Sequence, residues 1–243
     1  MFDHVTIRVA DRGASLHFYD TVLGAVRIER TYANGEFVEW DDFGLAAATA
    51  DKPPTTGLHI AFAADSRDAV DAFWRAGVDA GHADDGPPGP RPQYGPDYYG
   101  AFLLDPDGNS AEAVHHGSPR AGVVDHLWIR VADLGAATRF YELAGTHAGF
   151  RARGTATDPA RTHFAGRGGS FSVVTGTPTR NLHVAFPAST NAAVDAFHAA
   201  LTAAGHPDDG APGERLVYHA GYYGAFVLDP DGNNVELVNH NRG

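Results

Sequence analysis

Hydrophobic and polar residues alternate strictly in several short segments of the chain. In the segment HVTIRV at 4–9 every second residue is apolar, a period of two that predicts a strand with one buried face. Asp11 then stands as an N-cap before a stretch of helical period, and Gly24 ends it. Three further strands are expected at 26–30, 36–40 and 45–49.

A second set of the same elements follows. A strand is predicted at 58–63, and a helix begins after Ser66. A loop rich in Pro and Gly covers 86–92 and leads to a hairpin. The hairpin strands are 99–104 and 110–115, around the turn DPDGN, in which Pro and Gly favour a tight reversal.

The whole pattern then occurs a second time. DHVTIRVAD at 3–11 returns as DHLWIRVAD at 125–133, and the hairpin segment at 98–109 returns at 222–233. We therefore predict a tandem duplication, with domains at 1–117 and 122–243 and a join near His116 to Gly122. The predicted fold class is α+β: four βαβββ modules forming two curled mixed-sheet barrels with helices outside.

Both repeats keep two histidines and one glutamate at matching positions. In the first strand the apolar residues must face the helices, so His4 projects from the opposite face of the sheet. The same alternation places the other shared residues on this helix-free face. Two imidazoles and a carboxylate can hold a divalent metal and leave positions for water or substrate. The shared residues are His4, His59 and Glu112 in the first repeat and His126, His183 and Glu236 in the second.

Composition narrows the function classes. The formal net charge is −12, which disfavours binding to nucleic acid or anionic lipid. Cysteine is absent, so disulfides and thiolate metal sites are excluded. The N-terminus lacks a signal-peptide pattern and no apolar run approaches the roughly 20 residues of a membrane span, so we expect a cytoplasmic protein.

The repeated βαβββ order, the histidines on the first strands and the glutamate after each DPDGN turn resemble the vicinal oxygen chelate superfamily. This group includes glyoxalase I, bleomycin-resistance proteins and extradiol dioxygenases. The resemblance implies one metal held by His4, His59 and Glu112 and another by the matching trio of the second repeat. It also allows the first His of one repeat to join the second His and the Glu of the other, and the sequence leaves both arrangements open.

Three departures separate this chain from named activities of the superfamily. Glyoxalase I has a fourth protein ligand from the last strand of the first unit, but 45–49 and 171–175 contain no carboxylate. Extradiol dioxygenases have a tyrosine where Phe102 and Phe226 stand here. The fosfomycin-resistance enzymes bind phosphonate near the hairpin through polar groups, where this chain has glycine.

Several further residues are candidates for substrate chemistry. We predict His219 and Tyr222 as a catalytic acid/base and orienting pair, because they precede the hairpin that carries Glu236. Packing with solvated hydroxyls is the favoured alternative for each tyrosine, and structural salt bridges are the favoured alternative for the arginines. The predicted substrate-binding residues are Arg130, Trp128, Tyr98 and Arg8.

Two functions fit these observations. The first is a metal-dependent enzyme that chelates a small oxygenated substrate, with aromatic compounds among the candidates. The metal is Fe, Mn, Zn or Ni, and the chemistry is that of a dioxygenase, lyase or isomerase. The second is a binding protein that sequesters an aromatic antibiotic without metal or turnover. The expected partners are a small-molecule substrate or drug and a second copy of the chain, and not nucleic acid or membrane.

Overall fold

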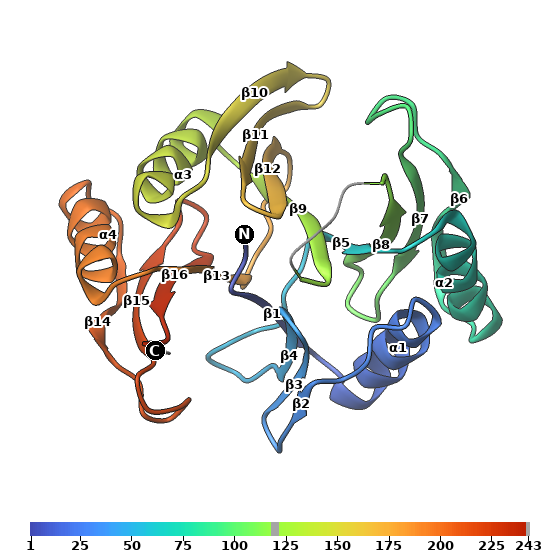
Figure 1. Ribbon diagram of the computed structural model, residues 1–243, viewed down its shortest axis with the longest axis horizontal. Helices are drawn as coiled ribbons and strands as arrows, with labels where there is room; N and C mark the ends of the chain where they lie inside the picture. The colour runs from blue at the N-terminus through green and yellow to red at the C-terminus, as the bar shows by residue number, and fades with distance from the viewer. Residues whose placement is uncertain (118–121, 242–243) are drawn as a thin grey trace.

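The computed structural model describes residues 1–117 and 122–241, and its elements follow the repeated order (Figure 1). The first repeat contains β1 (His4–Val9), α1 (Arg12–Ala25), β2 (Tyr32–Ala33), β3 (Phe37–Trp40), β4 (Phe43–Ala47), β5 (Leu58–Ala63), α2 (Arg67–Asp79), β6 (Ala83–Pro90), β7 (Tyr99–Leu104) and β8 (Ser110–His115). The second contains β9 (Val124–Val131), α3 (Leu134–Ala148), β10 (Arg151–Thr157), β11 (Ala160–Gly166), β12 (Gly169–Thr175), β13 (His183–Pro187), α4 (Asn191–Ala203), β14 (Asp208–Glu214), β15 (Tyr223–Leu228) and β16 (Asn234–Asn239).

The strands form two eight-stranded mixed sheets, and each sheet takes one half from each repeat. One has the order β14-β15-β16-β13-β1-β4-β3-β2, and the other has β10-β11-β12-β9-β5-β8-β7-β6. The halves join through antiparallel pairs, β1 with β13 and β9 with β5. The element order confirms the α+β class and the βαβββ modules. Both sheets end in edge strands, so they are open sheets and not the expected barrels.

The boundaries of the two sequence domains, 1–117 and 122–243, stay a prediction. The sheets do not follow that division, since β1 to β4 continue into β13 to β16. Part of the predicted join near His116 to Gly122 lies outside the described residues.

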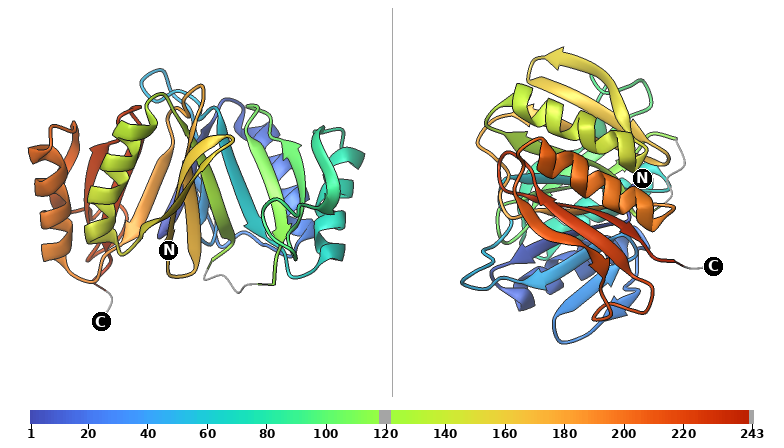
Figure 2. Two further views of the ribbon diagram at one scale, coloured as in Figure 1. Left: turned by 90° about the horizontal axis from the view of Figure 1, so that it is seen from above. Right: turned by 90° about the vertical axis from the view of Figure 1, so that its left-hand side faces the viewer.

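The helices lie at the two ends of the molecule and the strands between them (Figure 2). Helix α1 packs on α2 and helix α3 on α4, so contacts between helices stay within a repeat. In β1 the buried residues Val5, Ile7 and Val9 alternate with partly exposed ones, as the period of two predicts. The opposite face of each sheet is therefore left for polar side chains. No helix in the described parts of the chain is long and apolar enough to cross a bilayer.

Two segments have a different secondary structure from the one predicted: residues 26–30, after α1, and the proline-rich residues 86–92. Residues 26–30 were expected as a strand, but Arg27 has a φ of 63° and the chain turns there, so that only the two-residue β2 follows. The predicted loop at 86–92 is largely strand β6. Its prolines are compatible with pairing because β6 is an edge strand and bonds only to β7.

Candidate metal centres

Two clusters of two histidines and one glutamate lie on the helix-free faces of the sheets. Site I consists of His4, His183 and Glu236, and site II of His59, Glu112 and His126. Within each cluster one ligand atom of every residue lies within 4.8 Å of the others. Each site therefore combines the first histidine of one repeat with the second histidine and the glutamate of the other, the crossed arrangement that the sequence left open.

The atoms that converge in both clusters are the Nε2 nitrogens and one carboxylate oxygen. In site II, Glu112 Oε2 lies 3.0 Å from His59 Nε2 and 3.5 Å from His126 Nε2. In site I, Glu236 Oε2 lies 3.2 Å from His183 Nε2 and 3.6 Å from His4 Nε2. Two imidazole nitrogens and a carboxylate oxygen form a donor set that suits Fe, Mn, Zn and Ni.

The other ring nitrogen of the first histidine in each site is fixed by the preceding aspartate. His126 Nδ1 lies 2.8 Å from Asp125 Oδ1, and His4 Nδ1 lies 2.9 Å from Asp3 Oδ1. A carboxylate acceptor favours the proton on Nδ1 and leaves the Nε2 lone pair for a metal. Each aspartate also contacts a second histidine. Asp125 Oδ2 lies 2.7 Å from His116 Nε2, and Asp3 Oδ2 lies 2.9 Å from His240 Nε2.

The second histidine of each site is held from the neighbouring strand. His59 Nδ1 lies 3.2 Å from Ser110 Oγ, which donates to Asp85, and His183 Nδ1 lies 2.6 Å from Asn234 Oδ1. All four imidazoles thus have a polar partner at Nδ1 and turn Nε2 toward the cluster. This arrangement fits a metal better than a set of core histidines that only satisfy one another.

Each glutamate is buried and is held by a tyrosine. Tyr98 donates to Glu112 Oε1 at 2.8 Å, and Tyr222 donates to Glu236 Oε1 at 2.7 Å, while both carboxylates are 1% exposed. Oε2 is left facing the imidazoles. Burial, followed by the charge of the bound glutamate, raises the pKa of both tyrosines, so they stay protonated donors.

The two sites hold protons differently. Burial is the largest influence on His59 and lowers its pKa, although Glu112 opposes this. Burial also acts most strongly on His4, but the hydrogen bond that His4 donates to Asp3 and the charge of Glu236 outweigh it and raise the pKa of His4. His59 is therefore neutral, as a ligand must be, over a wider pH range than His4.

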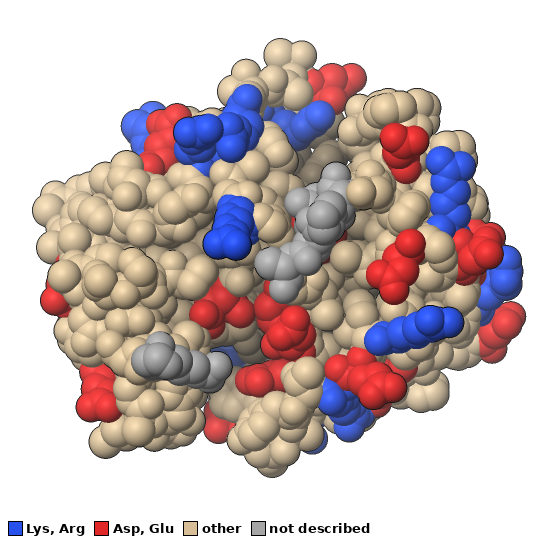
Figure 3. All heavy atoms as spheres, viewed as in Figure 1, with Lys and Arg blue, Asp and Glu red and all other residues tan. Residues whose placement is uncertain are grey.

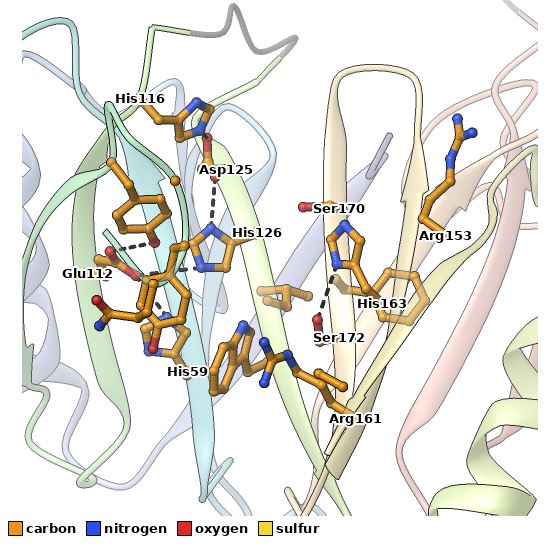
Figure 4. A pocket seen from close by; sticks show the side chains of 18 of the residues that line it. His59, Glu112, His116, Asp125, His126, Arg153, Arg161, His163, Ser170 and Ser172 are labelled. Atoms are coloured by element: carbon orange, nitrogen blue, oxygen red, sulfur yellow. Dashed lines mark hydrogen bonds and ion pairs between the residues drawn. The ribbon is translucent and has the colours of Figure 1, made fainter. Parts of the chain in front are cut away.

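A cavity of about 740 Å³ opens beside site II. The three cluster residues form one wall, and strands β10 and β11 with His163 and Arg161 form the opposite wall (Figure 4). Three predicted substrate-binding residues, Trp128, Arg130 and Tyr98, line this cavity. A volume of this size suits a small organic ligand.

The fourth predicted substrate-binding residue, Arg8, lies on the side of site I. Its Nη1 donates to the Ala47 carbonyl at 3.3 Å. Arg130 likewise donates to the Gly57 carbonyl at 2.7 Å. Both arginines donate to backbone carbonyls here, whereas the alternative to substrate binding expected from the sequence was a structural salt bridge.

His219 and Tyr222 lie at site I and not at the cavity of site II. His219 Nε2 lies 2.8 Å from His240 Nδ1, and His240 Nε2 lies 2.9 Å from Asp3 Oδ2. His219 is thereby connected to His4 through two intermediate residues. The roles of His219 and Tyr222 as an acid/base pair stay a prediction, and the contacts describe Tyr222 as a support for Glu236.

The sequence interpretation missed the residues that support the clusters and those on the far cavity wall. Asp3 and Asp125 had a visible signal, because both repeats contain the pair Asp-His. Arg153, Arg161 and His163 had none, because the first repeat lacks them and β10 was not predicted as a strand.

Comparison with known proteins agrees with the geometry. The model of the Glyoxalase/Bleomycin resistance protein/Dioxygenase superfamily matches residues 1–113 and 123–237. None of the curated proteins compared with the chain is a significant match.

Two solved structures that share the fold cover at least 98% of this chain. Glyoxalase I from Zea mays is 19% identical with a TM-score of 0.70, and the match covers 98% of this chain and 92% of that chain. A candidate dioxygenase from Bacillus subtilis is 12% identical with a TM-score of 0.66, covering 100% of this chain and 86% of that one. A glyoxalase/bleomycin resistance protein from Albidiferax ferrireducens T118 is 38% identical over 47% of this chain and 98% of its own, with a TM-score of 0.41.

Proposed function

Because this chain belongs to the Glyoxalase/Bleomycin resistance protein/Dioxygenase superfamily, we propose that it is a metal-dependent enzyme acting on a small oxygenated substrate at site II. Site I is proposed as a second metal centre. The observation that carries the proposal is the convergence of His59 Nε2, His126 Nε2 and Glu112 Oε2 beside a cavity of about 740 Å³.

The protein groups divide the work at site II. A divalent ion, when bound, supplies Lewis acidity that stabilises negative charge on two adjacent substrate oxygens. Asp125 keeps His126 oriented, and Tyr98 keeps one oxygen of Glu112 out of the cluster. Trp128 lines the cavity beside the cluster, with its ring centre 5.9 Å from that of His59, and β11 lines the opposite side.

A group that moves a proton at site II is proposed on the opposite wall. Gly95 of the first repeat stands at the position that His219 has in the second. The cavity of site II therefore has a glycine, which cannot move a proton, where site I has a histidine. His163 lines the cavity, and its Nδ1 lies 3.2 Å from Ser172 Oγ. We assign His163 as the acid/base of site II, because it lines the wall opposite the cluster and an imidazole can both accept and donate a proton.

Elemental analysis of protein purified without chelator tests the proposal. The native chain is expected to carry up to two equivalents of one transition metal. Glu112→Gln removes the charge of a ligand and is expected to lose the metal of site II alone, and Glu236→Gln that of site I alone. Glu142→Gln, at an exposed position of α3, is the matched control.

A metal-free native protein would sink the enzyme proposal. It would leave the second candidate, sequestration of an aromatic drug, which the size of the cavity and its aromatic lining favour. Metal content that is unchanged in both glutamate variants would equally contradict the assignment of the two sites.

A further inference from the structure

The cavity of site II has a basic wall. Arg130, Arg153 and Arg161 all line it, although the chain has a formal net charge of −12. Figure 4 places Arg153 and Arg161 across the cavity from Glu112. Basic side chains also gather above β10 and α3 on the face shown in Figure 3. The basic lining is thus a local feature.

Site I keeps Arg8 at the position of Arg130, but it differs at the positions of Arg161 and His163. The pairing registers of β11 with β12 and of β3 with β4 identify equivalent positions in the two repeats. Phe37 stands where the second repeat has Arg161, and Glu39 stands where it has His163. An aromatic ring and a half-buried carboxylate therefore replace two basic groups. The duplicated scaffold itself does not require arginine at this place.

An aromatic surface connects the basic wall to the cluster. Trp128 occupies the position of Thr6. The Arg161 guanidinium lies 5.5 Å from the Trp128 ring centre, and the rings of Tyr94 and His59 each lie 5.9 Å from it. A flat ring placed along this surface would reach from the arginine to the ligand histidine.

In the described part of the chain, the arginines of the wall form no ion pair. Within residues 1–117 and 122–241, no carboxylate lies within ion-pair distance of any of the three. Arg161 donates from Nη1 to the carbonyls of Asp158 and Pro159, both at 3.3 Å. Among the acidic residues of the cavity, Glu112 and Asp125 are bonded within the cluster, and Asp97 lies in the loop before β7. The positive charge of the wall is left for a ligand.

We propose that site II takes a planar aromatic substrate with two adjacent oxygens at one end and a carboxylate at the other. The carboxylate lies against Arg161, the ring lies along Trp128, and the adjacent oxygens face His59 and His126, while Arg153 adds positive charge to the same wall. A guanidinium is well matched to a carboxylate because it can donate two parallel hydrogen bonds. This substrate class rests on the proposed function, since the cluster is assigned to the oxygens.

Calorimetric titration of the full chain with two probes tests the inference. The probes are 3,4-dihydroxybenzoate, which has both features, and catechol, which lacks the carboxylate. The native protein is expected to bind 3,4-dihydroxybenzoate about ten-fold or more tightly than catechol, a typical gain from a charge-assisted pair. The double variant Arg153→Gln/Arg161→Gln is expected to bind the two probes about equally.

Two further variants keep the result interpretable. Arg151→Gln lies on the same strand β10 but outside the cavity lining, and it should keep the native preference. Arg161→Lys keeps the charge and should retain part of it, which separates loss of charge from misfolding.

The outcomes separate this inference from the proposed function. Equal binding of the probes by a metal-loaded native protein, no binding of either probe, or a preference that survives in the double variant would overturn the basic-wall assignment. A preference that depends on the arginines in a protein without metal would support the wall and overturn the metal-dependent function.

Discussion

At the scale of single residues, each of the two clusters depends on a neighbouring glycine as well as on its histidines and glutamate. Gly100 on β7 lies directly beside the Glu112 carboxylate, and a Cβ there would come within 2.4 Å of Oε1. Gly224 has the same relation to Glu236, at 2.6 Å. Each glutamate thus crosses the neighbouring strand through a space that only glycine leaves.

Gly100→Ala is expected to displace Glu112 and to remove the metal of site II while site I keeps its own. The crowding should cost about 1–3 kcal/mol of folding stability. Metal content per chain and the urea midpoint measure the two effects. Gly24→Ala is the control, because a Cβ at this position meets nothing within 4 Å. Full occupancy of site II in Gly100→Ala would contradict the steric argument.

At the scale of elements, the strands and helices with a clear hydrophobic period could be predicted from the sequence. The N-caps Asp11 and Ser66 and the DPDGN hairpins lie where predicted, because local hydrogen bonds and turn chemistry decide them. Strands β6, β10 and β14 could not be predicted in this way. Their polar, proline-containing or glycine-containing sequences pair only because a neighbouring strand is present, which is a tertiary effect.

One contact between elements makes stability depend on pH. Asp42, just before β4, accepts the N–H groups of Val123 and Val124 at 2.9 and 3.0 Å and so links the two sheets. Burial is the largest influence and raises the pKa of Asp42 from 3.8 to about 6, against the effect of those N–H groups. A raised pKa means that stability from this group is complete below pH 3.8 and is lost as the pH rises to about 6.

Asp42→Asn is neutral and keeps an oxygen acceptor for the two N–H groups. At pH 7.5 the variant is expected to be more stable than the native chain by roughly 1–3 kcal/mol, and the difference should vanish near pH 4. Urea unfolding at both pH values measures this, with the exposed Asp51→Asn as control. A stability difference that does not change with pH would show that the charge of Asp42 is not its cause.

At the scale of the whole molecule, the exchange of halves between the repeats decides how the sites are assembled. The sequence predicted the six residues that form the two clusters, because the repeat and the strand period are local patterns. It could not identify their partners. Pairing of β1 with β13 and of β9 with β5 depends on contacts between residues more than a hundred positions apart in one case and more than sixty in the other.

Separate expression of fragments 1–117 and 122–243 tests this assembly. Neither fragment contains the three ligands of site I or of site II, and each exposes the strands that pair across the repeats. Each fragment as a monomer is expected to bind no metal tightly, and the mixed or co-expressed pair to recover both sites. Size-exclusion chromatography with elemental analysis measures both. A monomeric fragment with native metal content would refute the crossed assembly.

The crossed sheets also limit how the duplicated gene can evolve. Loss of either half of the gene would disrupt both sites, since each half supplies residues to the two clusters. Neither copy can therefore decay while the other preserves one complete centre. The two sites can instead diverge at positions such as Arg161 and Phe37, each of which lies near one centre only. At this equivalent position the two repeats already have different residues.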